Sequence, residues 1–368
     1  MKETERFRCW AEIDLSAIRH NAAVARERIG SDVTLLAVVK ANGYGHGLAR
    51  VAQCLADEAG MFGVANLEEA NTCREVVPHP ILILGPALPA ERAEIVERGF
   101  VASVSSHAEA AEFSRHCHGQ TVAVNLVVDT GMGRMGIGER NAIAEIGAIA
   151  GLPGVEIHSV STHLPSADDD AEFTREQLQR FGAAVQQLRS ASARPYRAHA
   201  LLSAGVLGFS EHAHDIVRAG LMLYGIAPLA DHQSVLKPAM TFKARVVLVR
   251  DLPAGATVSY GRTFTARSPM RVATLGVGYA DGYPRALSNR RAEALIRGTR
   301  CAVLGRVTMD LIMVDVTHLA GVVVGDEAVL FGRQGSDEIL ASELAARAST
   351  IAWEIFTGIG ARVHRVYH

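Results

Sequence analysis

The sequence predicts an α/β protein in which a (β/α)8 barrel of the TIM type is followed by a smaller, mostly β domain. In the first two-thirds of the chain, eight short apolar runs alternate with amphipathic stretches. Eight β-then-α units in a row favour a closed barrel over a doubly wound open sheet, which is the alternative. After about Pro238 the runs are Val-rich and broken by Gly and Asp, as in a β domain. We therefore expect the barrel at residues 12–237 and the β domain at 238–368. We expect the N-terminal segment 1–11 to form part of the β domain.

The predicted barrel strands are too short for buried helices and rich in Val, Ile or Leu, as parallel strands covered on both faces should be. They lie at residues 33–39, 62–65, 81–84, 101–104, 121–128, 155–160, 198–202 and 216–219. Apolar residues at helical spacing mark intervening helices at 15–29, 48–59 and 171–190. The β domain shows strand patterns at 243–249, 272–275, 301–304, 312–316 and 328–330, with one helix at about 342–348.

Composition narrows the class of protein. The chain has 368 residues, is 49% hydrophobic and carries 37 Lys and Arg against 39 Asp and Glu, which excludes disorder as its dominant state and argues against a nucleic-acid partner. No apolar run reaches the roughly 18 residues that span a membrane, and the charged N-terminus leads into no signal-peptide pattern. Five scattered cysteines without a CxxC pair indicate reduced thiols in a cytoplasmic protein, and we expect no metal site. The His116-Cys117-His118 cluster has no further zinc ligands at suitable spacing, so we interpret it as a polar loop.

Active sites of such barrels lie at the C-terminal ends of the strands. The first predicted strand runs into Lys40 and a glycine-rich segment, 41–47, that contains Tyr44. A lysine that is desolvated there has a lowered pKa and suits Schiff-base chemistry. The alternative is a lysine that reaches solvent from the strand end. The neighbouring glycines favour the first interpretation, because they allow a ligand to approach the backbone closely.

Other strand ends carry residues of complementary chemistry. Arg134 lies in a glycine-rich loop after the fifth strand, where it suits bidentate binding of a carboxylate, although many surface loops look similar. The sixth strand ends at His163, for which a barrel-interior histidine is the alternative. Ser203 and the backbone amides of residues 220 and 221 follow the last two strands, where many barrels bind phosphate. Together with Lys40 and the inward-facing Arg218, they suggest pyridoxal phosphate (PLP) as the cofactor.

At this point the sequence resembles the alanine racemase family, in which a PLP-binding barrel precedes a β domain. The resemblance covers nearly the whole chain. Its strongest block is residues 38–47, with the sequence VVKANGYGHG, which is close to the family's PLP-attachment segment. Further blocks match at 129–136, 217–225, 236–238, 258–263, 278–283 and 305–310.

The resemblance implies a two-base racemisation of L- and D-alanine. Lys40 would carry PLP and act as base on one face of the substrate, and Tyr260 of the partner subunit would act on the other, so the site would be complete only in a homodimer. Arg218 would bond the pyridine nitrogen, with His163 supporting it. The phosphate would be held by Tyr44, Ser203, Gly220, Leu221 and Trp353. The substrate site would involve Arg134, Met309, Asp310 and Tyr279.

Three positions depart from the family pattern. Val127 stands where the family often has a carbamylated lysine that orients the arginine at 134, Leu202 stands for an asparagine, and Trp353 stands for a tyrosine. Because valine offers no acceptor, we expect Arg134 to be held by a substitute: a chloride, an ordered water, or Asn125.

Other functions stay open at this point. A racemase of another small amino acid, such as serine, uses the same chemistry. A non-catalytic PLP-binding protein would resemble the barrel alone, so the β domain and Tyr260 argue against it. A decarboxylase on a similar scaffold is a further alternative, although the blocks around Tyr260 and Met309 match the racemases better.

Overall fold

The computed structural model describes residues 3–191 and 196–368, and the chain folds as two compact units. The barrel unit consists of Ile18–Gly43 and Leu48–Lys237. The β unit consists of the N-terminal residues up to Ala17, the short segment Tyr44–Gly47 and Pro238–His368. The chain therefore passes between the two units at several points rather than through a single linker.

The barrel unit contains eight parallel strands in the order β10-β2-β3-β4-β5-β6-β8-β9. Their bounds are β2 (Thr34–Val38), β3 (Met61–Val64), β4 (Ile81–Pro86), β5 (Val101–Val104), β6 (Val122–Asp129), β8 (Val155–Ser161), β9 (Arg197–His199) and β10 (Ile216–Ala219). Among the described residues β9 and β10 share no strand ladder, but the Arg218 N–H donates to the Leu201 carbonyl at 2.9 Å across this seam. The strands thus form a nearly closed barrel, as the eight β-then-α units predict, and not an open doubly wound sheet.

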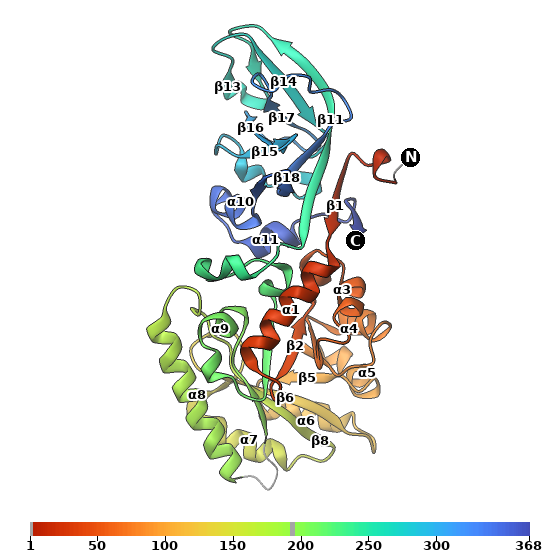
Figure 1. The fold of residues 1–368 in the computed structure, drawn as a ribbon. Coiled ribbons are helices and arrows are strands. Elements are labelled where there is room, and N and C mark those ends of the chain that lie inside the picture. Colours follow the sequence, from red (N-terminus) through yellow and green to blue (C-terminus); the bar gives the residue numbers. More distant parts are fainter. Residues whose placement is uncertain (1–2, 192–195) are drawn as a thin grey trace. The chain divides into compact units, whose positions relative to one another are not determined.

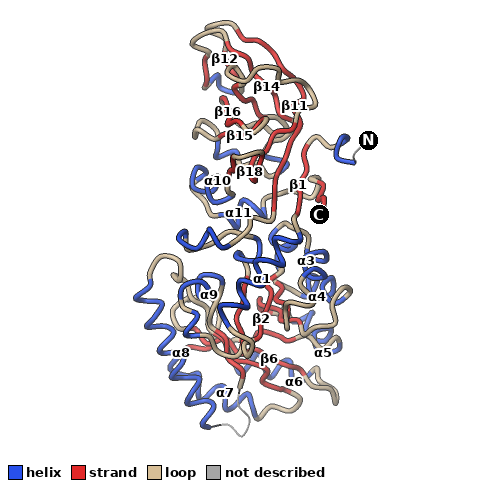
Figure 2. Tube along the Cα trace, in the orientation of Figure 1, coloured by secondary structure: helices blue, strands red, loops and turns tan. Residues whose placement is uncertain are grey.

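Helices surround these strands on the outside of the barrel unit (Figures 1 and 2). They are α1 (Leu15–Ile29), α3 (Leu48–Cys54), α4 (Leu67–Arg74), α5 (Arg92–Glu97), α6 (His107–Arg115), α7 (Ala142–Ala150), α8 (Ala171–Ala191) and α9 (Ser203–Gly208). Polar caps fix where two of them begin: Asn66 accepts from the Glu69 N–H at 3.0 Å, and Ser106 accepts from the Glu109 N–H at 3.2 Å. The two-residue strand β7 (Ile137–Gly138) pairs with β6.

The β unit is built on a ring of antiparallel strands. Pairings β15–β16, β16–β17, β17–β14, β14–β11, β11–β18 and β18–β15 close on themselves, so this ring is also a barrel. The strands are β11 (Met240–Leu252), β14 (Met270–Leu275), β15 (Glu293–Ile296), β16 (Thr299–Leu304), β17 (Ile312–Asp315) and β18 (Glu327–Gln334). Additional elements are β12 (Thr257–Val258), β13 (Phe264–Thr265), β19 (Asp337–Ile339), α10 (Ala341–Ala348) and α11 (Ala352–Thr357). Figure 2 shows the predominance of strands in this unit.

The N-terminal strand β1 (Cys9–Ile13) is a structural part of the β unit. It pairs antiparallel with β11 and parallel with β20 (His364–Tyr367). The sequence pattern predicts neither β1 nor β20, because both are short and each gains its partners from distant parts of the chain. The pattern also places the seventh barrel strand too far along, since β9 ends at His199 and not at Leu202.

Two further observations concern membranes and thiols. Within the residues that the structure describes, no helix combines the length and the apolar character that crossing a membrane would require. Cys9, Cys54, Cys73, Cys117 and Cys301 are all free thiols, as their scattered spacing predicts.

Trp10 gives a test of the β1 packing. Its side chain has no exposed surface, and the Arg245 guanidinium lies 4.6 Å from its ring centroid. We expect Trp10→Ala to lower the free energy of unfolding by about 3–5 kcal/mol, because it removes a fully buried aromatic ring. Urea denaturation measures this change. Leu248→Ala is the control, because Leu248 is exposed on β11 and its loss should cost no more than about 0.5 kcal/mol. Equal stability of Trp10→Ala and wild type would contradict the assigned role of β1.

Candidate active site

Lys40 directly follows strand β2 and its side chain is half-buried. Burial lowers the pKa of Lys40, and the nearby Arg134 guanidinium lowers it further, while Glu69 acts in the opposite direction. The strand end itself is fixed from across the barrel unit, because the Tyr224 hydroxyl donates to the Val38 carbonyl at 3.0 Å. The lysine is therefore held at the mouth of the barrel in a partly desolvated setting that favours its neutral form.

The chain after Lys40 winds left-handed. The segment α2 (Lys40–Tyr44) has positive φ angles at Ala41, Asn42, Gly43 and Tyr44. For residues other than glycine this conformation costs roughly 1–2 kcal/mol each, so it needs support. The Glu69 carboxylate provides part of it by accepting from the Asn42 N–H at 2.9 Å, and the Asn42 side chain accepts from the Leu48 N–H at 3.0 Å. The turn redirects the backbone immediately after the lysine.

Arg218 is the buried cation of this site, with 6% of its surface exposed. Its guanidinium donates to the carbonyls of Thr162, His199 and Ala200 at 2.6, 3.0 and 2.8 Å, and to the His199 ring nitrogen Nδ1. Burial, and secondarily Arg134, lowers the pKa of Arg218 to about 10, so it remains charged at neutral pH. Among the described residues no carboxylate pairs with Arg218, and its Nε–H has no acceptor.

The histidine that contacts Arg218 is His199, which the sequence reasoning missed. The expectation that His163 supports Arg218 stays a prediction, since no hydrogen bond joins these two side chains within the described residues. The position of His199, at the end of β9 and one strand from Arg218, is the signal that could have identified it.

His163 nevertheless lies close enough to Arg218, Arg134 and Lys40 for their charges to affect its pKa. Burial lowers its pKa to about 3, and the nearby Arg218, Arg134 and Lys40 contribute in that order. His163 is therefore neutral at physiological pH. These couplings bring Lys40, Arg134, His163 and Arg218 together at one end of the barrel unit, as the strand-end argument predicts.

Arg134 lies in a loop that is shaped by a carboxylate. Asp129 accepts from the N–H groups of Gly131, Met132 and Gly133 at 2.8–3.1 Å. Burial opposes ionisation of Asp129, but these hydrogen bonds outweigh it and lower the pKa of the carboxyl. The Arg134 side chain is exposed, and no group among the described residues accepts a hydrogen bond from it.

The expected role of Asn125 is wrong. Its buried amide bonds Ser161, Ser159 and His199 and not Arg134. Val127 is buried, with its side chain beside Gly136, so this position packs against the loop instead of holding the arginine. A chloride or a water as the acceptor for Arg134 stays a prediction.

The predicted phosphate donors lie close together. The Ser203 hydroxyl oxygen accepts from the N–H groups of Gly220 and Met222 at 2.9 and 3.2 Å, which joins the start of α9 to the start of η5 (Leu221–Tyr224). The hydroxyl hydrogen of Ser203 has no acceptor within the described residues. Leu221 occupies the first position of η5, where a backbone N–H has no partner inside the helix. Leu202 precedes α9 and gives it no side-chain cap.

Two further predicted phosphate ligands, Tyr44 and Trp353, belong to the β unit. Burial raises the pKa of Tyr44 to about 12, so its hydroxyl keeps its proton. Trp353 lies half-buried on α11. The segment around Tyr44 packs on this helix so closely that a Cβ at Gly45 would overlap the Phe356 carbonyl.

The predicted second-domain residues gather in one loop cluster, which we define as residues 259–262, 278–283 and 305–310. Ser259 donates to the Arg306 carbonyl at 2.6 Å, next to Tyr260. The Tyr279 N–H donates to the Thr308 carbonyl at 3.0 Å, which places Tyr279 beside Met309.

Two ion pairs of one arginine join segments of this loop cluster. Arg362 contacts Asp310 at 2.7 Å and Asp281 at 2.6 Å. Tyr260, Tyr279 and Met309 remain 71%, 40% and 53% exposed in the single chain.

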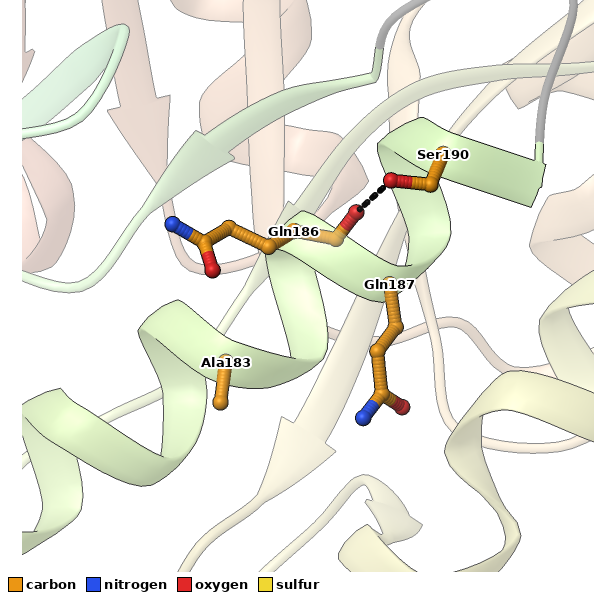
Figure 3. Close-up of a pocket in the computed structure, with 4 residues that line it drawn as sticks. All are labelled: Ala183, Gln186, Gln187 and Ser190. Carbon is orange, nitrogen blue, oxygen red and sulfur yellow. Dashed lines mark hydrogen bonds between the residues drawn. The ribbon is translucent and has the colours of Figure 1, made fainter.

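A surface hollow over α8 is unrelated to this chemistry. Figure 3 shows that it is lined by Ala183, Gln186, Gln187 and Ser190, and Ser190 donates to the Gln186 carbonyl at 3.0 Å. No residue that lines it is titratable. Within the described part of the chain, no group of three or more His, Cys, Asp or Glu side chains is arranged to hold a metal ion.

The buried histidines predict an acid-sensitive fold. Burial, with Arg197, lowers the pKa of His158 to about 4, and His163 and His199 are shifted in the same direction. As the pH falls below about 6.5, the unfolded chain binds these protons and the folded chain does not, so the free energy of unfolding decreases. His158→Gln should reduce the slope of unfolding free energy against pH between about 6.5 and 4. The exposed His318→Gln is the control and should keep the wild-type slope. Identical slopes for all three proteins would contradict the assignment.

Comparisons with known proteins agree with this geometry. Residues 13–228 match the family described as alanine racemase, N-terminal domain, and residues 239–367 match alanine racemase, C-terminal domain. A curated alanine racemase of Symbiobacterium thermophilum is 46% identical over 97% of this chain and 96% of its own length.

Solved structures extend the comparison to the fold. The alanine racemase of Clostridium difficile 630 has a TM-score of 0.92 at 30% identity, over 98% of this chain and 96% of that one. The enzyme of Bartonella henselae, described with covalently bound pyridoxal phosphate, has a TM-score of 0.89 at 28% identity, over 98% of this chain and 100% of that one. The chain belongs to the alanine racemase family, the PLP-dependent isomerases that interconvert L- and D-alanine.

Proposed function

We propose that the chain racemises alanine by two bases that act on opposite faces of the substrate, Lys40 and Tyr260. The observation that carries the proposal is the grouping of a desolvated lysine with Arg134, His163 and Arg218 at one end of the barrel unit. Racemisation requires that a proton leaves one face of Cα and that another arrives on the opposite face. Two groups on two faces accomplish this without turning the substrate over.

The donor set suits PLP. Lys40 would carry the cofactor, whose ring would supply an electron sink for the charge that develops at Cα. Arg218 would bond the pyridine nitrogen through the Nε–H that no protein group uses. A cation in this place, rather than a carboxylate, keeps that nitrogen unprotonated and weakens the sink, which restrains side reactions. Burial of a guanidinium without a carboxylate is otherwise costly, so a ligand acceptor at this point fits the chemistry.

The phosphate would be bound by hydroxyls and amides instead of cations. The Ser203 O–H, the amides of Gly220 and Leu221, the protonated Tyr44 hydroxyl and the Trp353 N–H are donors without charge. Ser203 is supported for this role because its oxygen already accepts two backbone N–H groups and its hydrogen remains available.

Each base has a distinct setting. Burial and Arg134 lower the pKa of Lys40, so a larger fraction is neutral and able to accept the Cα proton near pH 7. Arg134 would hold the substrate carboxylate, together with the Met309 backbone. Tyr260 would hold the proton for the second face, with Asp310 and Tyr279 close to the substrate path.

A homodimer is the assembly that we propose. Tyr260, Tyr279 and Met309 are large and exposed in one chain. The Arg362 ion pairs link the segments that carry Tyr279 and Met309. Exposed apolar patches of this kind mark interaction surfaces. Completion of the site by Tyr260 of the partner subunit would account for them.

Lys40→Ala tests the cofactor attachment. We expect wild-type protein to retain PLP absorbance and, after borohydride reduction, to yield a pyridoxyl label on the peptide that contains Lys40. The variant should lose both the label and the racemisation of L- and D-alanine, measured by chiral chromatography. Lys237→Ala is the control and should keep both. A label on Lys237 or Lys243 would overturn the assignment.

Tyr260→Phe removes one proton donor and keeps the ring. Racemisation should fall by roughly 10²–10⁴-fold in both directions, while exchange of the Cα hydrogen with deuterated solvent persists for the enantiomer that Lys40 serves. Mixing this variant with Lys40→Ala should restore up to about a quarter of wild-type activity, because half of the randomly formed dimers contain one intact site of two. Absence of any recovery after verified subunit exchange would place both residues in one subunit.

Because position 127 is a valine, we predict that racemase activity does not depend on bicarbonate. A carbamate cannot form on valine, so we expect equal kcat and KM for alanine in CO2-depleted buffer and in buffer with added bicarbonate. Arg134→Ala should raise KM, because the substrate carboxylate loses its cation. Arg140→Ala, at an arginine just beyond the same loop, is the control. A KM that is unchanged by Arg134→Ala would show that the arginine plays no part in substrate binding.

A further inference from the structure

The interior of the barrel unit contains a buried polar network that begins at Arg218. It passes through His199 on β9, Asn125 on β6 and Ser159 and His158 on β8. Arg197, at the start of β9, is its other end, and this arginine also donates to Thr34 at the start of β2 at 2.7 Å. The network therefore runs from the strand ends that carry the candidate site to the strand starts.

The site end of the network has a fixed direction. Arginine only donates hydrogen bonds, so the His199 Nδ1 that contacts Arg218 must be the acceptor. A neutral imidazole then carries its hydrogen on Nε2. This N–H donates to the Asn125 side-chain oxygen at 3.0 Å and has a longer contact, at 3.3 Å, with the Ser159 hydroxyl oxygen. The tautomer of His199 thus follows from its two neighbours.

At the Arg197 end of the network, the hydrogen bonds are donated in the opposite sense along the network, again toward Asn125. Arg197 donates to His158 Nε2 at 3.5 Å, so the hydrogen of His158 is on Nδ1 and is donated to the Ser159 hydroxyl at 3.1 Å. Ser159 in turn donates to the Asn125 side-chain oxygen at 3.0 Å. Two chains of donors, each started by an arginine, therefore converge on one oxygen atom of Asn125.

Asn125 is well suited to this convergence. It is 2% exposed, and its NH2 group donates to Ser161 at 3.0 Å and weakly to Ser103 at 3.4 Å. The shorter bond, to Ser161, fixes which end of the amide faces His199. Within the described residues, none of the network side chains bonds a carboxylate. The acceptor that the two chains of donors share is the neutral side-chain amide of Asn125.

We propose that Asn125 is a positioning residue for the racemase reaction. Its oxygen selects the His199 tautomer that offers a lone pair to Arg218, and this contact helps to aim the guanidinium at the cofactor ring. Asn125 touches neither cofactor nor substrate and acts only through His199 and Arg218. The inference rests on the proposed place of Arg218 beside the pyridine nitrogen.

The surrounding charges explain why a neutral acceptor is needed. The groups that act electrostatically on His199 are Arg218 from β10, His158 from β8, Arg197 from β9 and His214 from the loop before β10. Together with burial, which is the largest cause, they hold the pKa of His199 well below its usual range. A carboxylate in the place of the amide would favour a doubly protonated His199, whose Nδ1–H would oppose the Arg218 N–H instead of accepting it.

The test uses Asn125→Asp and Asn125→Leu of the holoenzyme, with Ser103→Ala as the matched control on the other side of the same amide. Nitrogen-15 NMR of histidine-labelled protein reads the tautomer, and the spectrum of His199→Gln identifies the signals. Wild type should show His199 neutral, with hydrogen on Nε2, between about pH 6 and 9. Asn125→Asp should show a doubly protonated His199 at the lower pH, with kcat about tenfold reduced there and recovering as the pH rises. Asn125→Leu should lower kcat at all pH values, and Ser103→Ala should match wild type.

Three outcomes overturn the inference. These are a wild-type His199 with hydrogen on Nδ1, an Asn125→Asp variant with wild-type His199 signals and pH profile, or an equal loss of kcat in Ser103→Ala. Because the first of these is read on wild type, a variant that fails to fold leaves the test intact. If wild type did not racemise alanine, the proposed function would fail, while the NMR result would still decide the tautomer.

Discussion

A guanidinium that is buried without a carboxylate is the constraint on which the barrel unit depends. Arg218 stands at the seam between β9 and β10, where its backbone N–H bonds Leu201 and its side chain bonds the carbonyls of Thr162, His199 and Ala200. One residue therefore supplies much of the hydrogen bonding that a ladder supplies between the other strands. The carbonyls on which it relies lie just where β8 and β9 end, so the short length of β9 is part of the same arrangement. The same hydrogen bonds of Arg218 therefore join β10 to β9 and hold a cation at the end of the barrel unit.

The barrel unit has ion pairs elsewhere, such as Arg180 with Glu139 and Arg189 with Asp215, but the candidate site has none among the described residues. Lys40, Arg134, His163 and Arg218 lie near one another, and all of the resolved shifts among them favour neutral lysine and histidine. In the proposed function, the substrate carboxylate would bring negative charge to this group. The polar interior behind the group supplies acceptors without charge, so it supports Arg218 without competing for that anion.

Much of this arrangement is predictable from the sequence, and the reasons for the exceptions are physical. Lys40 directly follows β2, Arg134 follows β6 and Arg218 lies near the end of β10, which are the positions that apolar runs followed by polar residues predict in a parallel barrel. Their roles stay predictions. His199 escapes this pattern, because the predicted seventh strand runs to residue 202 and so hides that His199 is the last residue of β9. The left-handed turn after Lys40 also escapes, since Ala41 and Tyr44 do not favour positive φ and adopt it only under contacts such as that of Glu69 with Asn42. The exposure of Tyr260 and the bridge from Arg362 to Asp310 depend on pairings between distant segments, which local patterns do not contain.

The turn after Lys40 also bears on how the protein is made. Residues Tyr44–Gly47 belong to the β unit, where Gly45 lies against the Phe356 carbonyl and accepts a hydrogen bond from Arg365, and Gly47 lies against the Tyr367 hydroxyl. Arg365 lies 320 residues beyond Gly45 in the sequence. The segment that directly follows Lys40 can therefore gain these contacts only after the distant part of the β unit has been synthesised and has folded. The local geometry at the end of β2 thus depends on the folding of the β unit, although β2 itself belongs to the barrel unit.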